Sequence, residues 1–491
     1  MSATHVESSP GVLARLGDRL NPLVVKEVRQ GLRSRVFWVS FGMMLLACLI
    51  ISMVAYVSTL DGGLSSRGQG FFFAFFVCLG LVHFFIIPYS AYRSLARERE
   101  DETWVLLILT GLGPRSILRG KVASFLVQAG LYASAVGPFL LFSYYLNGID
   151  LPTILVVLAL GASWLVFLTV VAVCAATLAD GRMGRALVHL GLLGLLGLSL
   201  LYGLTAAFVL GEQGFRSLAR EDEFLAFAVG FLWAMLTYGW LLFETAAARL
   251  SLPTENYSQG PRLAFTVQAL LTALLVVALW LVEDKDADVV IGASLLGCFH
   301  LGLTGIFLST DIDGQARPLR AATRPWSLLR PGAVRGFRLV LLMVLFWAGL
   351  CGGLHLFSET RMKGEATFLL VLAAPAYVLL YLSLALVLGR MPRSERLAAP
   401  AVVRVLFFTL LGVAGALPPL LAVLFDRPVD DPLFNLLNPF VGLGNFGDYD
   451  YSQNMAKMNL ELLACVWLVA ALAAFAADRA LVERERRAHA S

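Results

Sequence analysis

Long apolar runs separated by short polar segments fill almost the whole chain. Each run carries few charges and is long enough to cross a hydrocarbon core of roughly 30 Å once as a helix. The pattern predicts an all-α fold, a polytopic membrane protein with about 12 transmembrane helices. The twelve runs are at residues 36–60, 70–92, 122–147, 152–179, 186–210, 224–248, 263–282, 289–310, 339–357, 368–389, 401–425 and 459–477.

The runs fall into two sets of six, which predicts two transmembrane bundles. We expect a cytoplasmic amino-terminal segment at 1–35, a first bundle at 36–250 and a second bundle at 263–491. An inner loop at 93–121 separates the second and third runs of the first bundle. An outer loop at 426–457 precedes the last run of the second bundle.

Composition and charge agree with this class and set an orientation. The chain is 58% hydrophobic and 15% charged, with a mean hydropathy of +0.77, values that exclude a soluble domain of 491 residues. With the amino terminus in the cytoplasm, the inner segments hold 30 of the 38 Lys and Arg residues and the outer loops hold 8. The positive-inside rule then places both termini in the cytoplasm. The net charge of +4 therefore reports orientation and does not indicate nucleic-acid binding.

A basic amphipathic segment, NPLVVKEVRQGLRSR at 21–35, precedes the first run. Asn21 can cap a helix that starts at Pro22, and the apolar positions then fall near one face. We expect this helix to lie in the membrane interface, with its basic side toward anionic headgroups. A simple basic flank that only sets topology is the alternative. The basic positions are Lys26, Arg29 and Arg33.

The inner loop contains a short apolar stretch between acidic and basic clusters. As a helix, Thr103 to Thr110 would rise only about 12 Å, too little to span a bilayer. Acidic residues precede it and complement a helix start, whereas Gly111 and Pro114 end it. Pro114 can then begin a second helix that continues through Lys121 into the third run. The pattern predicts a short apolar helix held outside the membrane.

These residues resemble a known family. The order Glu98, Glu100, Thr103, followed by LLILTGLGPRSILRGK, is similar to the loop between the second and third spans of permease subunits of ATP-binding cassette transporters, in the type-two exporter class. The segment at 21–38 resembles that family's amino-terminal interfacial helix, and 437–463 resembles the segment before its last span. Glu102 replaces a Gly of the family. The family usually has six spans, so this chain is either two fused halves or one half with an inserted bundle.

The resemblance implies a function. This chain would form the substrate pathway and catalyse no chemistry, with no catalytic, cofactor or metal site of its own. ATP and Mg would bind a separate ATPase subunit, and the permease would pair as a homodimer or with another permease in a bacterial-type inner membrane. The short helix would be the coupling helix that docks onto the ATPase. The expected interface residues are Glu98, Glu100, Glu102, Thr103, Trp104, Leu107, Ile108, Thr110 and Gly111.

An ion-driven secondary transporter of the major facilitator kind is the first alternative. The stretch LADGRMGR at 178–185 echoes a loop of that family, but Gly181 breaks the spacing and the stretch follows the fourth run instead of the second. Such carriers need ionisable groups deep in the bundle. We interpret Glu244 as pairing with Arg249 or reaching the interface. The histidines, which we interpret as hydrogen-bonded interior residues, are His83, His189, His300 and His355.

A membrane-embedded transferase is the second alternative. Carboxylates cluster in the outer segments 282–289 and 426–432 and could bind a divalent cation. Short polar loops of a hydrophobic protein also need charge to stay in water, which explains the same clusters more simply. The stretch GPRSILRGKVA has the wrong spacing for a phosphate-binding loop, and Val122 stands where a Mg-binding hydroxyl belongs. Any ATPase must therefore be another chain.

Overall fold

The computed structural model describes most of the chain. The described residues are 22–60, 68–101, 111–146, 149–179, 181–252, 254–311, 327–359, 365–390, 399–447 and 460–490. Within them the fold is all-α, with no strand, as the sequence predicts.

Twelve spans in the described residues are long and apolar enough to cross a membrane, so the chain is a polytopic membrane protein. The second span is built of three consecutive segments: α4 (Gly68–Leu81), η2 (Val82–Ile86) and α5 (Ile87–Glu100). The other eleven are α3 (Arg35–Leu60), α7 (Pro114–Tyr145), α8 (Leu151–Ala175), α9 (Arg182–Gln213), α11 (Asp222–Leu250), α12 (Gln259–Val282), α13 (Ala287–Ser309), α15 (Ala333–Leu356), α16 (Glu365–Arg390), α17 (Pro400–Leu424) and α19 (Leu460–Ala490).

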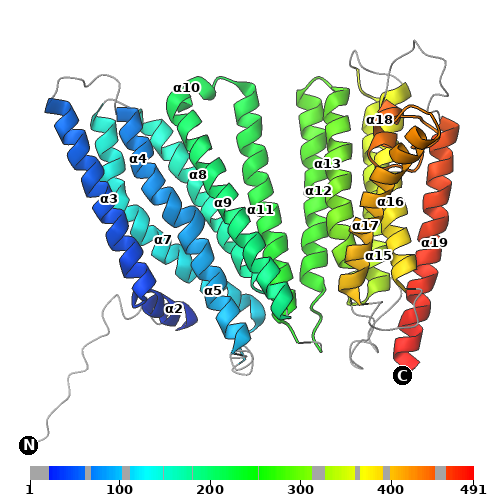
Figure 1. The fold of residues 1–491 in the computed structure, drawn as a ribbon, viewed down its shortest axis with the longest axis horizontal. Coiled ribbons are helices and arrows are strands. Elements are labelled where there is room, and N and C mark those ends of the chain that lie inside the picture. The colour runs from blue at the N-terminus through cyan, green and yellow to red at the C-terminus, as the bar shows by residue number, and fades with distance from the viewer. Residues whose placement is uncertain are drawn as a thin grey trace, which may run out of the picture. The chain divides into compact units, whose positions relative to one another are not determined.

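The chain divides into two compact units, Met1–Ser251 and Leu252–Ser491, with six spans in each. In both units the long helices run side by side (Figure 1). Unit 1 also contains the short helices α2 (Pro22–Leu32) and α10 (Phe215–Leu218), and unit 2 contains α18 (Val441–Gly447). The spans of each unit alternate between two ends. We call the end at which the second span stops and the third begins the basic end of that unit.

The two units share one internal arrangement. In unit 1 the second span packs against the third, fourth and fifth spans, and α8 packs against α11. In unit 2 the second span, α13, packs against α15, α16 and α17, and α16 packs against α19. The fourth and sixth spans are thus neighbours in both units. Of the two origins considered for twelve spans, this agreement favours two fused six-span halves.

Several helices extend beyond the apolar runs that mark them in the sequence. α7 begins at Pro114, eight residues before the apolar run at 122, and α5 continues to Glu100. The physical reason is that hydropathy measures the depth of the membrane, whereas backbone hydrogen bonding continues through charged turns in water or headgroups. The predicted helix start at Pro114 is confirmed: Gly113 is the N-cap in extended conformation and Pro114 occupies the first turn.

A π-helical turn interrupts the second span at Val82–Ile86. The Ile87 N–H donates to the carbonyl of Val82, five residues back. Pro88 follows directly, has no N–H, and in a regular α-helix its ring would collide with the carbonyl of Phe84 four residues earlier. The wider turn relieves this conflict. Proline therefore accounts for the local change of pitch.

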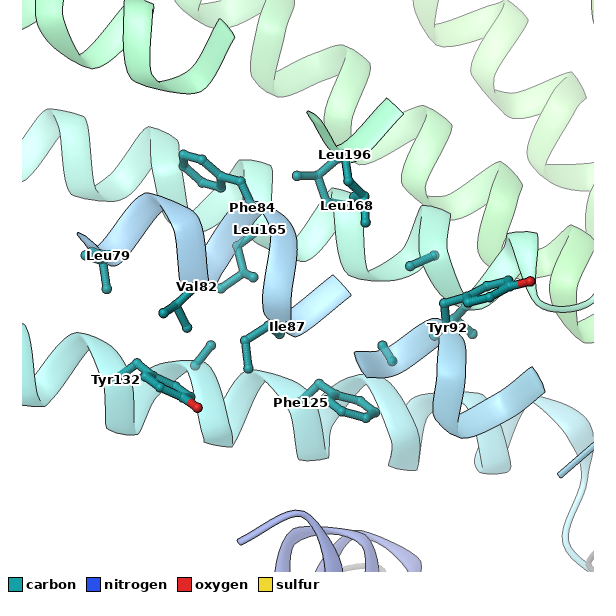
Figure 2. Close-up of a cluster of buried hydrophobic side chains, with 14 of the residues drawn as sticks. Leu79, Val82, Phe84, Ile87, Tyr92, Phe125, Tyr132, Leu165, Leu168 and Leu196 are labelled. Carbon is teal, nitrogen blue, oxygen red and sulfur yellow. The ribbon is translucent and has the colours of Figure 1, made fainter. Parts of the chain in front are cut away.

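The same turn directs side chains to opposite sides of the span. Figure 2 shows Phe84 on the side of Leu196, whereas Ile87 points toward Phe125 of α7. The ring of Phe84 lies so close to α9 that a Cβ at Gly203 would come within 2.8 Å of it. All four labelled side chains named here belong to one buried hydrophobic cluster that holds unit 1 together.

Candidate functional site

The amino-terminal helix is formed as predicted and lies against α7. α2 packs on α7 so closely that a Cβ at Gly31 would come within 2.4 Å of the Gln128 side chain. Its basic residues Lys26, Arg29 and Arg33 are exposed. Glu27, in contrast, is buried. α2 thus presents a basic surface outward and a single carboxylate inward.

Buried Lys121 joins three elements at the basic end of unit 1. The Lys121 Nζ lies 2.7 Å from Oε1 of Glu98 at the end of α5 and 3.3 Å from Oε1 of Glu27 in α2. It also donates to the Ser94 hydroxyl at 3.1 Å. The Lys121 side chain is fully buried, so its charge is stable only with these partners. This cluster of Glu27, Ser94, Glu98 and Lys121 is called the lysine cluster below.

The lysine cluster sets the geometry of the predicted coupling loop. Glu98 lies before the loop and Lys121 lies after it, so their ion pair holds the two stems of the loop together. Glu27 attaches α2 to the same point. Truncating one partner of a buried ion pair typically costs about 3–5 kcal/mol, because the other charge stays buried without compensation. A load applied to the loop is therefore carried into three helices at once.

Two further contacts brace the loop stems. Arg115, in the first turn of α7, donates to both carboxylate oxygens of Glu244 in α11, with its Nη2 2.8 Å from Oε2. Arg99 donates to the Ala176 carbonyl at 3.0 Å. The predicted partner of Glu244, Arg249, is replaced by Arg115. Five residues correspond to about 140° around a helix, so Arg249 lies on a different face of α11.

The predicted interface residues lie at this end of the molecule as far as the structure describes them. Glu98 belongs to the lysine cluster, and Glu100 is exposed at the end of α5. Gly111 has φ +83°, a left-handed conformation that favours glycine and agrees with its expected role as a helix stop. The other predicted residues lie outside the described residues: Glu102, Thr103, Trp104, Leu107, Ile108 and Thr110.

Unit 2 has its own buried cation at the basic end. The Arg262 Nη2 lies 3.0 Å from Oδ2 of Asp311 and also donates to the Gly332 carbonyl at 2.9 Å. Its Nη1 donates to the Leu328 carbonyl at 2.9 Å. Tyr257 donates to Oδ1 of Asp311 at 2.9 Å. Arg262 thus ties the start of the first span of unit 2 to both sides of the loop between its second and third spans.

The environment of this pair affects one group outside the spans. Burial, followed by the negative charge of Asp311, raises the pKa of the Tyr257 phenol above its ordinary value. The phenol therefore stays protonated and keeps donating to Asp311 at neutral and mildly alkaline pH.

Ion pairs also attach the third span of unit 2 to its last span. The Arg335 Nη2 lies 2.5 Å from Oε1 of Glu485. Arg338 contacts both carboxylate oxygens of Asp478, at 2.8 and 3.0 Å. α15 and α19 are thereby fastened at the basic end.

The groups considered for the alternative functions take structural contacts. Nε2 of His83 lies 3.1 Å from the Ala129 carbonyl, His189 contacts the Tyr89 hydroxyl at 3.2 Å, and His355 contacts the Thr367 hydroxyl at 3.2 Å. These agree with hydrogen-bonded interior histidines. Within the described ranges, no group of three or more His, Cys, Asp or Glu side chains is arranged to hold a metal ion.

Sequence reasoning missed the roles of Glu27, Lys121 and Arg262. The available signal was weak: Lys121 and Arg262 each begin an apolar run, a position that also suits ordinary topology-setting residues. Comparisons with family models, curated proteins and solved structures find no match for this chain.

Proposed function

We propose that this protein is the permease subunit of an ATP-binding cassette exporter of the type-two class, in a bacterial-type inner membrane with both termini in the cytoplasm. The chain forms the substrate pathway and carries out no chemistry itself. A separate ATPase subunit binds ATP and Mg, and residues 102–110 dock onto it. The observation that carries the proposal is the lysine cluster, whose ion pairs join both loop stems and α2.

The physical argument concerns transmission of force. A docked loop moves helices only if its stems resist independent motion. Lys121 connects α7 to α5 and α2, and Arg115 connects α7 to α11. A displacement of the loop by the ATPase would therefore shift four helices of unit 1 together. Exposed basic residues on α2 would keep this end at the headgroup layer.

The repeated arrangement of the two units supports a proposal on stoichiometry. Because each unit has six spans with the same neighbours, the paired permease of the transporter would be the second unit of the same chain. One permease chain would then assemble with two ATPase subunits. Native mass spectrometry of the purified complex measures this ratio. Two permease chains for two ATPase subunits would contradict it and restore the homodimer.

Substitutions in the loop test the docking itself. In the docked helix, Trp104 and Leu107 share one apolar face. Leu107→Glu and Trp104→Ala should each weaken copurification of the ATPase and uncouple ATP hydrolysis from transport, while leaving membrane insertion intact. Truncating a central interface Trp commonly costs about 2 kcal/mol or more of binding energy. Trp38→Ala is the matched control, because Trp38 is exposed in α3 at the same end of unit 1. Unchanged copurification in both loop variants would reject the proposal.

A further inference from the structure

A cationic pocket lies between α5 and α9 at the basic end of unit 1. Its volume is about 250 Å³, just below the roughly 300–1,000 Å³ of pockets that enclose whole drug-sized ligands. It is therefore large enough for a headgroup fragment but not for a complete lipid. Its charged and titratable lining residues are Arg93, Arg97, Arg182, Arg185, Glu100 and His189.

The lining charges come from matching stripes on two neighbouring helices. Arg93, Arg97 and Glu100 recur at four- and three-residue spacing along α5. Arg182 and Arg185 recur in the same way at the start of α9, and the two helices are in contact. Four guanidinium groups against one carboxylate leave a net positive pocket. In the part of the chain that the structure describes, none of the four guanidinium groups forms an ion pair or a hydrogen bond with a side chain or carbonyl.

Guanidinium groups stay charged and present several donors in one plane, which suits bidentate binding of phosphate oxygens. The first turn of α9 adds backbone N–H groups and the positive end of its dipole. At the inner wall, His189 stacks on Tyr89 and Tyr92, with ring centroids 5.7 and 5.5 Å apart. The pocket wall is therefore rigid, while its arginines are available to a ligand.

The surface beside the pocket indicates where the rest of the ligand would lie. Met183, Leu187 and Leu190 are exposed at helical spacing along α9. On a helical wheel this stripe is about 100° from the arginine stripe, so the two faces adjoin. A polytopic protein turns exposed apolar helix faces toward acyl chains. A headgroup in the pocket would thus have its chains beside this stripe.

We propose that this pocket binds the phosphate group of an anionic phospholipid headgroup. Basic pockets between transmembrane helices are known to bind such headgroups. Because the pocket uses the last turns of α5, a bound lipid would neutralise arginines directly beside the loop stem at Glu98 and Glu100. The site requires neither an ATPase partner nor transport activity.

The test compares two double variants of the purified full-length protein. Arg93→Gln with Arg185→Gln removes two pocket charges, and Arg216→Gln with Arg220→Gln removes two exposed charges at the opposite end of unit 1. Native mass spectrometry measures binding of phosphatidylglycerol, with phosphatidylcholine as the neutral reference. We expect the pocket variant to bind phosphatidylglycerol at least about tenfold more weakly than the wild type, because charge-assisted bonds are lost. The control should bind as the wild type does.

Further arms separate a weak fold and a soluble ligand from the proposal. Should the first pocket variant not fold, Arg97→Gln with Arg182→Gln repeats the test at exposed arginines. Equal binding of the two lipids by the wild type, or equal losses in pocket and control variants, overturns the proposal. Inorganic phosphate and glycerophosphoglycerol are added as soluble probes. If either raises the melting temperature of the wild type as much as phosphatidylglycerol does, a soluble phosphate ester is the ligand and the lipid assignment is overturned.

Discussion

The Lys121 Nζ lies 2.7 Å from Oε1 of Glu98, and this contact joins α7 to the last turn of α5 across residues that belong to the predicted coupling loop. The lysine is fully buried, whereas Glu98 is partly exposed. Lys121 is therefore the member of the lysine cluster that depends on its partners, and removing it leaves both Glu27 and Glu98 without their cation.

Substitution of Lys121 should destabilise unit 1. We expect Lys121→Met to lower the free energy of unfolding by about 3 kcal/mol, because two carboxylates lose a buried partner. Unfolding in mild detergent with increasing denaturant measures this change. Arg119→Met is the matched control, since Arg119 is exposed in the same turn region of α7 and should change stability by less than about 0.5 kcal/mol. Similar losses in both variants would contradict the role of the cluster.

The Arg115–Glu244 pair should contribute much less. The Arg115 side chain is 52% exposed, so water screens the interaction despite its bidentate geometry. We expect a coupling energy of about 1 kcal/mol or less in a double-mutant cycle of Arg115→Gln and Glu244→Gln. The cycle is measured from the unfolding midpoints of the four proteins. A coupling energy several times larger would mean that the pair is effectively buried in the membrane-bound protein.

The orientation of the chain can be tested by labelling single cysteines in a background without the six native ones. Asp101 lies at the basic end of unit 1, and Ser217 lies at the opposite end. Because basic residues favour the cytoplasmic side, Asp101→Cys should react with an impermeant thiol reagent only after the membrane is opened. Ser217→Cys should react from outside in intact cells. The reverse pattern would place both termini outside.

Close helix packing in unit 2 predicts different effects for two glycines of α15. A Cβ at Gly336 would lie 1.9 Å from the Leu308 carbonyl oxygen of α13, whereas a Cβ at Gly349 would meet nothing within 4 Å. Gly336→Ala should therefore cost about 1–3 kcal/mol or more, since a backbone carbonyl cannot move aside. Gly349→Ala should be neutral or slightly stabilising. Melting temperatures of the two purified variants test this, and equal values would show that α13 and α15 are not in close contact.

Amino-acid sequence alone was enough to predict the all-α class, the twelve spans, the helix α2 and the helix start at Pro114. These features depend on local properties: apolar length against membrane thickness, helical periodicity, and the backbone restrictions of proline. Each can be read within a window of about 20 residues. The π-turn before Pro88 belongs to the same kind of local cause, although the apolar run hid it.

Tertiary structure decided which charges meet. Lys121 contacts Glu27 and Glu98, Glu244 takes Arg115 as its partner instead of Arg249, and Arg262 closes on Asp311. In the sequence each of these groups is only one charge near the end of an apolar run, with several candidates of opposite sign nearby. The choice depends on which helices become neighbours and how each is rotated, because a charge can be buried only where packing brings its partner within hydrogen-bonding distance.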